Sequence, residues 1–189
     1  MMLLSKIKSK KWLASKTAKG FTVIEMLVTM GVLTILGGIL ILYSRAGEST
    51  TVLLRELAKV SGDINRAKNL AITTTTFVDK DGNKTNPCGY GVYFDLLQNQ
   101  YIIFADLASD CATSQHLRDT ERNGDVETIS LNKPLELKSA EPNQVFFLPP
   151  DPTVIFPGAA TEMEIRMGPA NGVVIMSVKV NKTGQVSTY

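Results

Sequence analysis

A single carboxylate interrupts the longest apolar run of the sequence. The run covers residues 21–43, which is 23 residues, and Glu25 is its one charged member. Lys19 and Gly20 come immediately before the run. A charged side chain inside a bilayer is costly, and it costs less near the interface. Glu25 therefore has either a partner or a task, or it is an acid that snorkels to the membrane surface.

The other residues that could do chemistry lie far from this run. The one histidine, His116, is in a polar segment with Ser114 and Asp119 close by in sequence. A Ser-His-Asp triad requires the three groups to converge on a rigid scaffold, so we interpret His116 as a loop residue. The sequence also lacks a zinc-type Cys/His cluster and a Gly-rich phosphate loop after a strand. We therefore expect a protein that is not an enzyme.

A short acidic segment raises the question of calcium. Asp79, Asp81 and Asn83 place oxygen-bearing side chains at alternate positions of "DKDGN". An EF-hand loop needs Gly at its sixth position and Glu at its twelfth, whereas here Gly is fourth and Tyr90 is twelfth. We favour a polar turn and expect no cofactor, with calcium left open as a weak alternative.

The chain contains two cysteines, Cys88 and Cys111. In an oxidising compartment they could form one disulfide that closes a loop of roughly 24 residues, which the chain-entropy estimate values at about 3 kcal/mol. The alternative is two unpaired small residues. The choice depends on the side of the membrane on which this part of the chain lies.

The length of the apolar run and the charges before it together indicate that side. At about 1.5 Å per residue, a helix of this length spans a hydrocarbon core. The first 20 residues hold six lysines and no acid, and positive charge stays on the cytoplasmic side. The amino end is therefore expected inside and the chain after about residue 45 outside, where disulfides persist. The run is too long for a cleaved secretory signal and lacks its small-residue cleavage site.

The basic character of the chain belongs to its leader. The formal net charge is +2, but the chain after residue 20 has 14 basic residues against 18 acidic ones. The carboxyl tail, residues 179–189, adds two basic residues, Lys179 and Lys182. A net acidic body has no general electrostatic attraction for nucleic acid, so we do not expect nucleic acid as a partner.

An apolar stripe follows the membrane segment at spacings of 4, 3, 4, 3 and 4 residues: Leu53, Leu57, Val60, Ile64, Ala67 and Ala71. This spacing predicts an amphipathic helix that continues the membrane helix. The charged residues off the stripe, Glu56 among them, are expected to form a solvated face. The β-branched run at 73–77 ends the pattern.

From residue 77 the pattern changes to short runs of period two, separated by Gly, Pro and Asn. Residues 89–95 and 100–106 predict a hairpin, and a turn separates 126–131 from 135–140. Further strands are expected at 144–149, 153–157, 162–167, 173–180 and 185–189. The chain thus divides into a leader (1–20), a membrane helix (21–45), its amphipathic continuation (46–76) and a β-rich domain (77–189). The expected fold is α+β, a long helix packed on an antiparallel sheet or sandwich.

The stretch "KGFTVIEMLV" resembles the processing site of type IV pilins and of type II secretion pseudopilins. That signal is a basic leader, Gly, usually Phe, Glu at the fifth mature position and about 20 apolar residues. The resemblance implies that prepilin peptidase cuts between Gly20 and Phe21 and methylates the new amine of Phe21. It also implies a single-pass protein of the inner membrane, with a cytoplasmic amino end and a periplasmic or other extracytoplasmic domain.

Cleavage would give Glu25 a partner. The new cationic amine of Phe21 lies one helical turn away, and in a filament it could instead pair with Glu25 of a neighbouring subunit. Pairing recovers much of the cost of two charges in an apolar core, and it would set the axial offset between subunits. Many pilins have a proline in this helix, whereas here Gly37 and Gly38 provide either a soft point or a surface for close packing.

Later segments resemble the GspH/FimT-type minor pseudopilins. These segments are "RAKNLAI" (66–72), "GYGVYFD" (89–95) and the strand-Gly-strand pair "VVIMSVKVNKTGQV". The resemblance implies a pilin-like β-sandwich at or near the tip of a short fibre. Its partners would be prepilin peptidase, other pilins or pseudopilins, and an inner-membrane assembly platform. Two hypotheses stay open beside it, a minor type IV pilin of a pilus or DNA-uptake machine and a membrane-tethered binding domain that never enters a filament.

Overall fold

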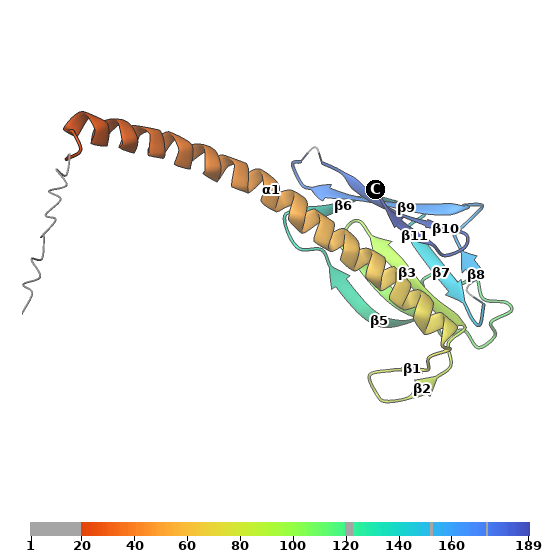
Figure 1. Cartoon of the computed structure of the whole chain (residues 1–189). Coiled ribbons are helices and arrows are strands. Elements are labelled where there is room, and N and C mark those ends of the chain that lie inside the picture. Colours follow the sequence, from red (N-terminus) through yellow and green to blue (C-terminus); the bar gives the residue numbers. More distant parts are fainter. Residues whose placement is uncertain (1–19, 120–122, 152, 173) are drawn as a thin grey trace, which may run out of the picture. The chain divides into compact units, whose positions relative to one another are not determined.

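The computed structural model describes residues 20–119, 123–151, 153–172 and 174–189, with residues 42–49 and 123 described by their backbone alone. The predicted leader lies outside the described residues, apart from Gly20. The chain divides into two units, Met1–Ser44 and Arg45–Tyr189. Figure 1 shows the elements of both.

A helix of 50 residues, α1 (Val23–Ile72), contributes to both units. Its first part, Val23–Ile41, has 19 residues with a mean hydropathy of 2.2 and no part buried inside the protein. A helix that is apolar on all sides requires apolar surroundings, and this length spans a bilayer core. The apolar helix predicted from the sequence is therefore present, and it indicates a membrane anchor.

The second part of α1 packs into a folded domain. All six residues of the predicted stripe are at most 2% exposed, which confirms the amphipathic helix. The solvated face is wrong at Glu56, because this side chain is only 6% exposed. The Asn132 side-chain amide donates a hydrogen bond of 3.0 Å to the Glu56 carboxylate. The segment that contains Asn132 thus covers a position that helical spacing alone marks as polar.

One antiparallel sheet has five strands in the order β5-β4-β3-β7-β8. Their bounds are Asn123–Ser130, Gln100–Asp106, Gly89–Asp95, Gln144–Leu148 and Thr153–Ile155, in that order. β3 and β4 pair from Gly89↔Asp106 to Asp95↔Gln100, so the predicted hairpin is confirmed with its bounds.

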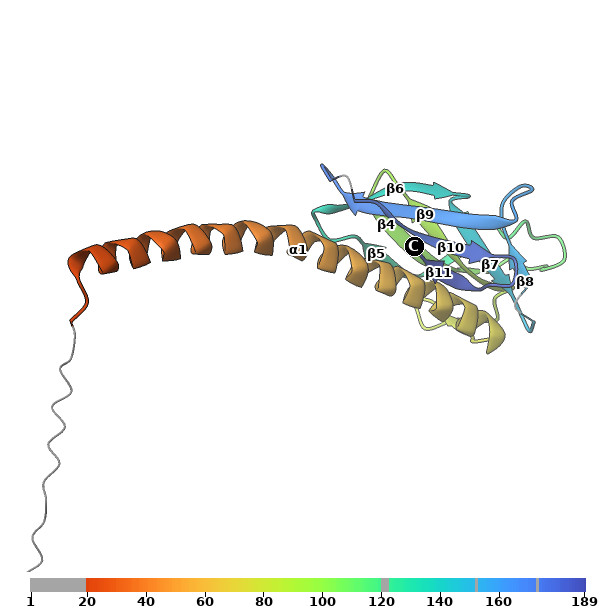
Figure 2. The same ribbon diagram turned by 45° about the horizontal axis from the view of Figure 1, so that its top comes forward.

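A second antiparallel sheet has the order β11-β10-β9-β6, and Figure 2 shows it from a second direction. Its strands are Val186–Thr188, Met176–Asn181, Glu162–Pro169 and Leu135–Glu141. The strands on either side of the predicted turn at 132–134, β5 and β6, belong to different sheets. β10 begins three residues later than predicted. A small hairpin, β1 (Phe77–Val78) with β2 (Lys84–Thr85), forms where the sequence indicated a turn.

The buried stripe of α1 shares one core with a face of each large sheet, which gives the expected α+β architecture. The five-stranded sheet is also covered on its opposite face, where Phe104 and Phe146 are fully buried. Gly91 makes room for them, since a Cβ there would lie 2.6 Å from the Phe104 ring. The His116 ring stacks on Phe146 with centroids 4.7 Å apart. The segment after β4 therefore forms a lid over this second face.

Candidate functional site

The amino end of α1 begins at a threonine cap. The backbone N–H of Glu25 donates to Thr22 Oγ1 at 3.3 Å, and the Thr22 carbonyl accepts from the N–H groups of Glu25 and Met26. A hydroxyl that accepts from the third helical N–H is the usual N-cap arrangement. Gly20 and Phe21 precede the cap, outside the helix, and the Phe21 side chain is 73% exposed. The bond that joins them is consequently available to an enzyme.

Glu25 is exposed on the first turn of this helix. With Thr22 it forms the Thr-x-x-Glu spacing of a capping box, in which the acid can bond back to the cap residue. A carboxylate in this turn also interacts favourably with the positive end of the helix dipole. Glu25 therefore lies near the position of the amine that cleavage would create. The capping role alone does not require a partner for Glu25 from another chain.

The rest of the membrane-length segment has exposed apolar side chains and two glycines with free space beside them. Thr29 and Thr34 donate their hydroxyls to carbonyls of the preceding turn, which satisfies these groups without water. A Cβ added at Gly37 or Gly38 would meet nothing within 4 Å. The two glycines therefore leave a shallow place on the helix where a second helix could approach closely.

The structure joins Cys88 and Cys111 in a disulfide, with their Cα atoms 5.3 Å apart. The Cys88 N–H donates to the Asp106 carbonyl at 2.8 Å. The bridge thus ties the start of β3 to the segment that follows β4. This is a structural role, since no thiol remains to react.

Ser114, Asp106 and His116 do come together, but in an order unsuited to a triad. Ser114 Oγ donates to Asp106 Oδ2 at 2.6 Å, and His116 Nδ1 lies 2.9 Å from the same oxygen. A nucleophilic serine must bond to the histidine, with the acid behind it, whereas here the acid stands between them. The sequence suggested Asp119 as the acid of this group, and the residue that takes this place is Asp106. The cluster pins the lid segment.

The calcium candidates form a compact turn. The Asp79 carboxylate accepts hydrogen bonds from the N–H groups of Asp81 and Asn83 and from the Asn83 side chain, at 2.8–2.9 Å. These bonds, with the Asn83 side chain first, lower the pKa of Asp79. Its oxygens are thus occupied by donors of the turn. Among the described residues, no group of three His, Cys, Asp or Glu is placed to hold a metal.

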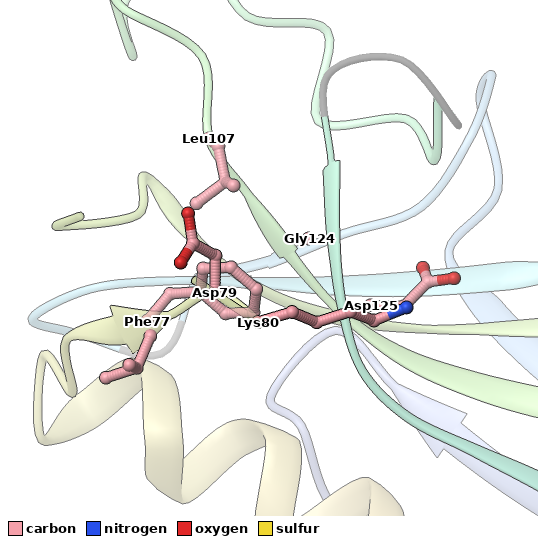
Figure 3. Close-up of a pocket in the computed structure, with 7 residues that line it drawn as sticks. Phe77, Asp79, Lys80, Leu107, Gly124 and Asp125 are labelled. Atoms are coloured by element: carbon pink, nitrogen blue, oxygen red, sulfur yellow. The ribbon is translucent and has the colours of Figure 1, made fainter. Parts of the chain in front are cut away.

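A depression of about 380 Å³ lies between this hairpin and β5. Its lining residues are Phe77, Val78, Asp79, Lys80, Leu107, Gly124 and Asp125, and Figure 3 shows six of them labelled. The Phe77 ring lies against Gly124, where a Cβ would meet the ring within 2.8 Å. The titratable groups in the lining are Asp79, Lys80 and Asp125, and Asp79 is already bonded within its own turn. The chemically distinctive place in the described chain is the amino end of α1.

Comparison with known proteins supports that choice. Residues 15–41 match the family described as "Prokaryotic N-terminal methylation motif". The match includes Gly20, Phe21 and Glu25, and it ends at the last residue of the membrane-length segment. The chain therefore carries the prepilin motif predicted from its sequence. No curated protein sequence matches the chain significantly.

Among solved structures, the chain is similar to one titled "Structure of the minor pseudopilin EpsH from the Type 2 Secretion System of Vibrio cholerae". The TM-score is 0.45 at 15% identity, and the alignment covers 71% of this chain and 93% of that chain. A TM-score below 0.5 is too low to support a conclusion, so the fold rests on the elements described above.

Proposed function

We propose that this chain is the precursor of a pilin-like filament subunit. Prepilin peptidase cuts it between Gly20 and Phe21 and methylates the amine of Phe21, and the mature helix then joins a filament. The methylation motif at residues 15–41 is the observation on which this proposal rests. The exposed, non-helical position of the Gly20–Phe21 bond supports it, because a peptidase requires access to an extended backbone.

The local geometry also suits assembly after cleavage. The apolar residues of Val23–Ile41 have no buried contacts within the described chain, so they need lipid before assembly and neighbouring helices after it. Glu25 would then meet the Phe21 amine of a neighbouring subunit in an apolar bundle, where an unpaired charge is strongly unfavourable. That requirement fixes how far one subunit is offset from the next.

The specific machine we propose is a type II secretion system, with the chain as a minor pseudopilin. The resemblance of residues 66–72 and 89–95 to the GspH/FimT-type proteins supports this assignment. The partners would be prepilin peptidase, other pseudopilins and an inner-membrane assembly platform. The chain would act as a structural subunit of the inner membrane, not an enzyme, and would need no cofactor.

A minor pilin of a pilus or DNA-uptake machine is the second candidate. DNA binding would depend on the basic residues near the carboxyl end. Lys179 Nζ lies 4.0 Å from Glu164 and 5.8 Å from the centre of the Tyr189 ring, and Arg166 also pairs with Glu164. These contacts reduce the positive charge offered to a phosphate, which favours the secretion assignment over DNA capture.

Co-expression with a prepilin peptidase tests the proposal. The wild-type chain is expected to shift to a faster gel mobility only when the peptidase is present. A Gly20→Leu variant should keep the precursor mobility, because the bulky side chain blocks the cleavage site. Gly31→Leu is the matched control, since Gly31 has open space around it and lies outside the cleavage site. If the wild-type chain stays uncut with the peptidase present, the filament-subunit proposal is refuted, and the alternative of a membrane-tethered domain remains.

A further inference from the structure

One end of the folded domain gathers three chain connections. These are the β3–β4 turn (residues 96–99), the β5–β6 connection (131–134) and the described residues of the β9–β10 connection (170–172 and 174–175). Asn99 links the first two, because its carbonyl accepts from the Leu131 N–H at 3.0 Å. The Pro134 carbonyl links the second to the third by accepting from Ala170 N–H at 2.9 Å. We call this the basal end of the domain.

The first buried turn of α1 belongs to the basal end as well. Asn132, in the β5–β6 connection, donates to Glu56, which lies three residues after Leu53, the first residue of the buried stripe. Figures 1 and 2 both show the β9–β10 connection at the same end of the domain as the start of β6. The helix therefore enters the domain at its basal end.

Apolar side chains are exposed at this end. Leu97 is 98% exposed at the tip of the β3–β4 turn, next to the half-exposed Leu96. Val174 and Ile175 are about half exposed in the β9–β10 connection. Tyr189 is also exposed, and it pairs with Ser177 through two backbone bonds near the start of β10. Single exposed apolar residues are ordinary, whereas several on one end of a domain mark a surface that contacts something.

The length of the intervening chain indicates what that surface meets. The membrane-length segment ends at Ile41, and Leu53 is 12 residues further along α1. At 1.5 Å per residue the helix between them reaches about 18 Å. Leu53, where α1 enters the basal end, is therefore tethered within about 18 Å of the end of the apolar segment. The headgroup layer of one leaflet is roughly 5–8 Å thick, so a helix of this length passes through it, and the basal end meets the lipid when the helix tilts.

The chemistry of the basal end fits a lipid interface. Leucine, isoleucine and valine side chains partition into the boundary between headgroups and acyl chains, and tyrosine is enriched there. Arg55 and Lys133 are exposed at the same end and can approach anionic headgroups. Each of these residues lies in a turn, a connection, the chain terminus or the helix, so none has to leave a sheet to reach the membrane.

We propose that the basal end docks on the surface of the membrane that anchors the chain, with Leu97 and Ile175 inserted at the interface. The docked state holds the domain against the bilayer before assembly, and extraction into a filament must release it. This inference rests on the membrane anchor of the proposed function, and it is independent of peptidase processing and of filament assembly.

Tryptophan quenching in the full chain tests the docking. Trp12 is the one tryptophan of the sequence, so a Trp12→Phe background permits single-tryptophan reporters. The reporters are Leu97→Trp at the basal end, Leu33→Trp in the membrane-length segment and Val78→Trp as a matched exposed control away from the basal end. Val78 is 52% exposed on the β1–β2 hairpin. Each variant is reconstituted into vesicles of anionic and zwitterionic phospholipid, with or without brominated acyl chains.

Brominated lipid is expected to lower the emission of Leu33→Trp and Leu97→Trp by about twofold or more and to leave Val78→Trp nearly unchanged. If Leu97→Trp behaves like Val78→Trp while Leu33→Trp is quenched, the docking is refuted and the anchor stands. If Leu33→Trp is not quenched, the anchor and the docking both fail. Equal quenching of all three reporters would mean nonspecific adsorption. If Leu97→Trp emission is blue-shifted but not quenched by brominated lipid, and shifts to the red on tenfold dilution of protein in lipid, the docking is refuted and the surface is assigned to a second copy of the chain.

Discussion

At the scale of single residues, Glu25 combines two roles that can be separated. The Thr22 cap and the acid three residues later form a spacing that stabilises a helix start by itself. A capping acid needs no filament, whereas an acid that pairs with the Phe21 amine of a neighbour does. The two roles differ in their need for charge, because glutamine can also complete a capping box.

Glu25→Gln is therefore expected to be processed normally and to enter filaments poorly. The variant keeps the cap but leaves the Phe21 amine without a counter-charge in an apolar bundle, a loss of about 3 kcal/mol or more. The measurement is the fraction of mature protein in sheared fibres, compared with the membrane fraction. Thr22→Val is the control, since it removes a cap worth about 1 kcal/mol and keeps the charge. Normal assembly of Glu25→Gln would show that capping alone explains the acid.

Asp79 provides a pH prediction outside the membrane segment. The hydrogen bonds from Asn83 and Asp81 favour its ionised form and lower its pKa below the ordinary value of 3.8. Their stabilisation of the turn is therefore complete above the ordinary pKa and is lost as the pH falls through the lowered pKa. Carboxyl-carbon NMR of the full chain in detergent measures the midpoint. Asn83→Ala should raise it, because the side chain of Asn83 is the largest cause, and an unchanged midpoint would contradict this geometry.

At the scale of elements, local patterns predicted most of the structure. The 4-3-4 spacing identified the six buried residues of α1, and alternation located β3 and β4 with their bounds. The Thr22 cap was not among these predictions, although Thr-x-x-Glu before an apolar run is a helix-start signature. The methylation motif was recognisable, since its residues are contiguous in the chain.

The features that the sequence did not reveal depend on long-range contacts. Glu56 is polar by its position on the helix, and Asn132, 76 residues away, makes it a buried group. The grouping of Asp106 with Ser114 and His116 depends on how the lid segment folds back over β7, where His116 meets Phe146. The assignment of β5 and β6 to different sheets likewise depends on partners elsewhere in the chain. Periodicity carries no information about any of these.

Two glycine substitutions test the packing of the elements. Gly91→Ala is expected to lower the free energy of unfolding of the domain by about 1–3 kcal/mol, because the new methyl group would meet the Phe104 ring and the Val145 carbonyl within 2.8 Å. Gly62→Ala on α1 is the matched control, since Gly62 is exposed with nothing within 4 Å. It should raise the stability by about 0.5–1 kcal/mol. Denaturant unfolding of both variants, followed by circular dichroism, measures these changes. If the free energy of unfolding of Gly91→Ala equalled that of the wild type, the packing described here would be contradicted.

At the scale of the whole molecule, the chain separates two kinds of surface. Val23–Ile41 exposes apolar side chains on every side, whereas the domain buries the stripe of α1 and the inner faces of both sheets. The domain thus has its own core, and the apolar helix has all of its sides available for lipid or for other helices. This division suits a subunit that moves from a membrane into a bundle of helices.

The central claim is that the working protein begins at Phe21, two residues before α1. Intact mass spectrometry of the protein, isolated from membranes of cells that contain prepilin peptidase, tests this most directly. The expected species starts at Phe21, lacks the lysine-rich residues 1–20 and carries one added methyl group on its amino terminus. A protein that retains those residues in such cells would contradict the claim, and with it the pairing of Glu25 with a new amine.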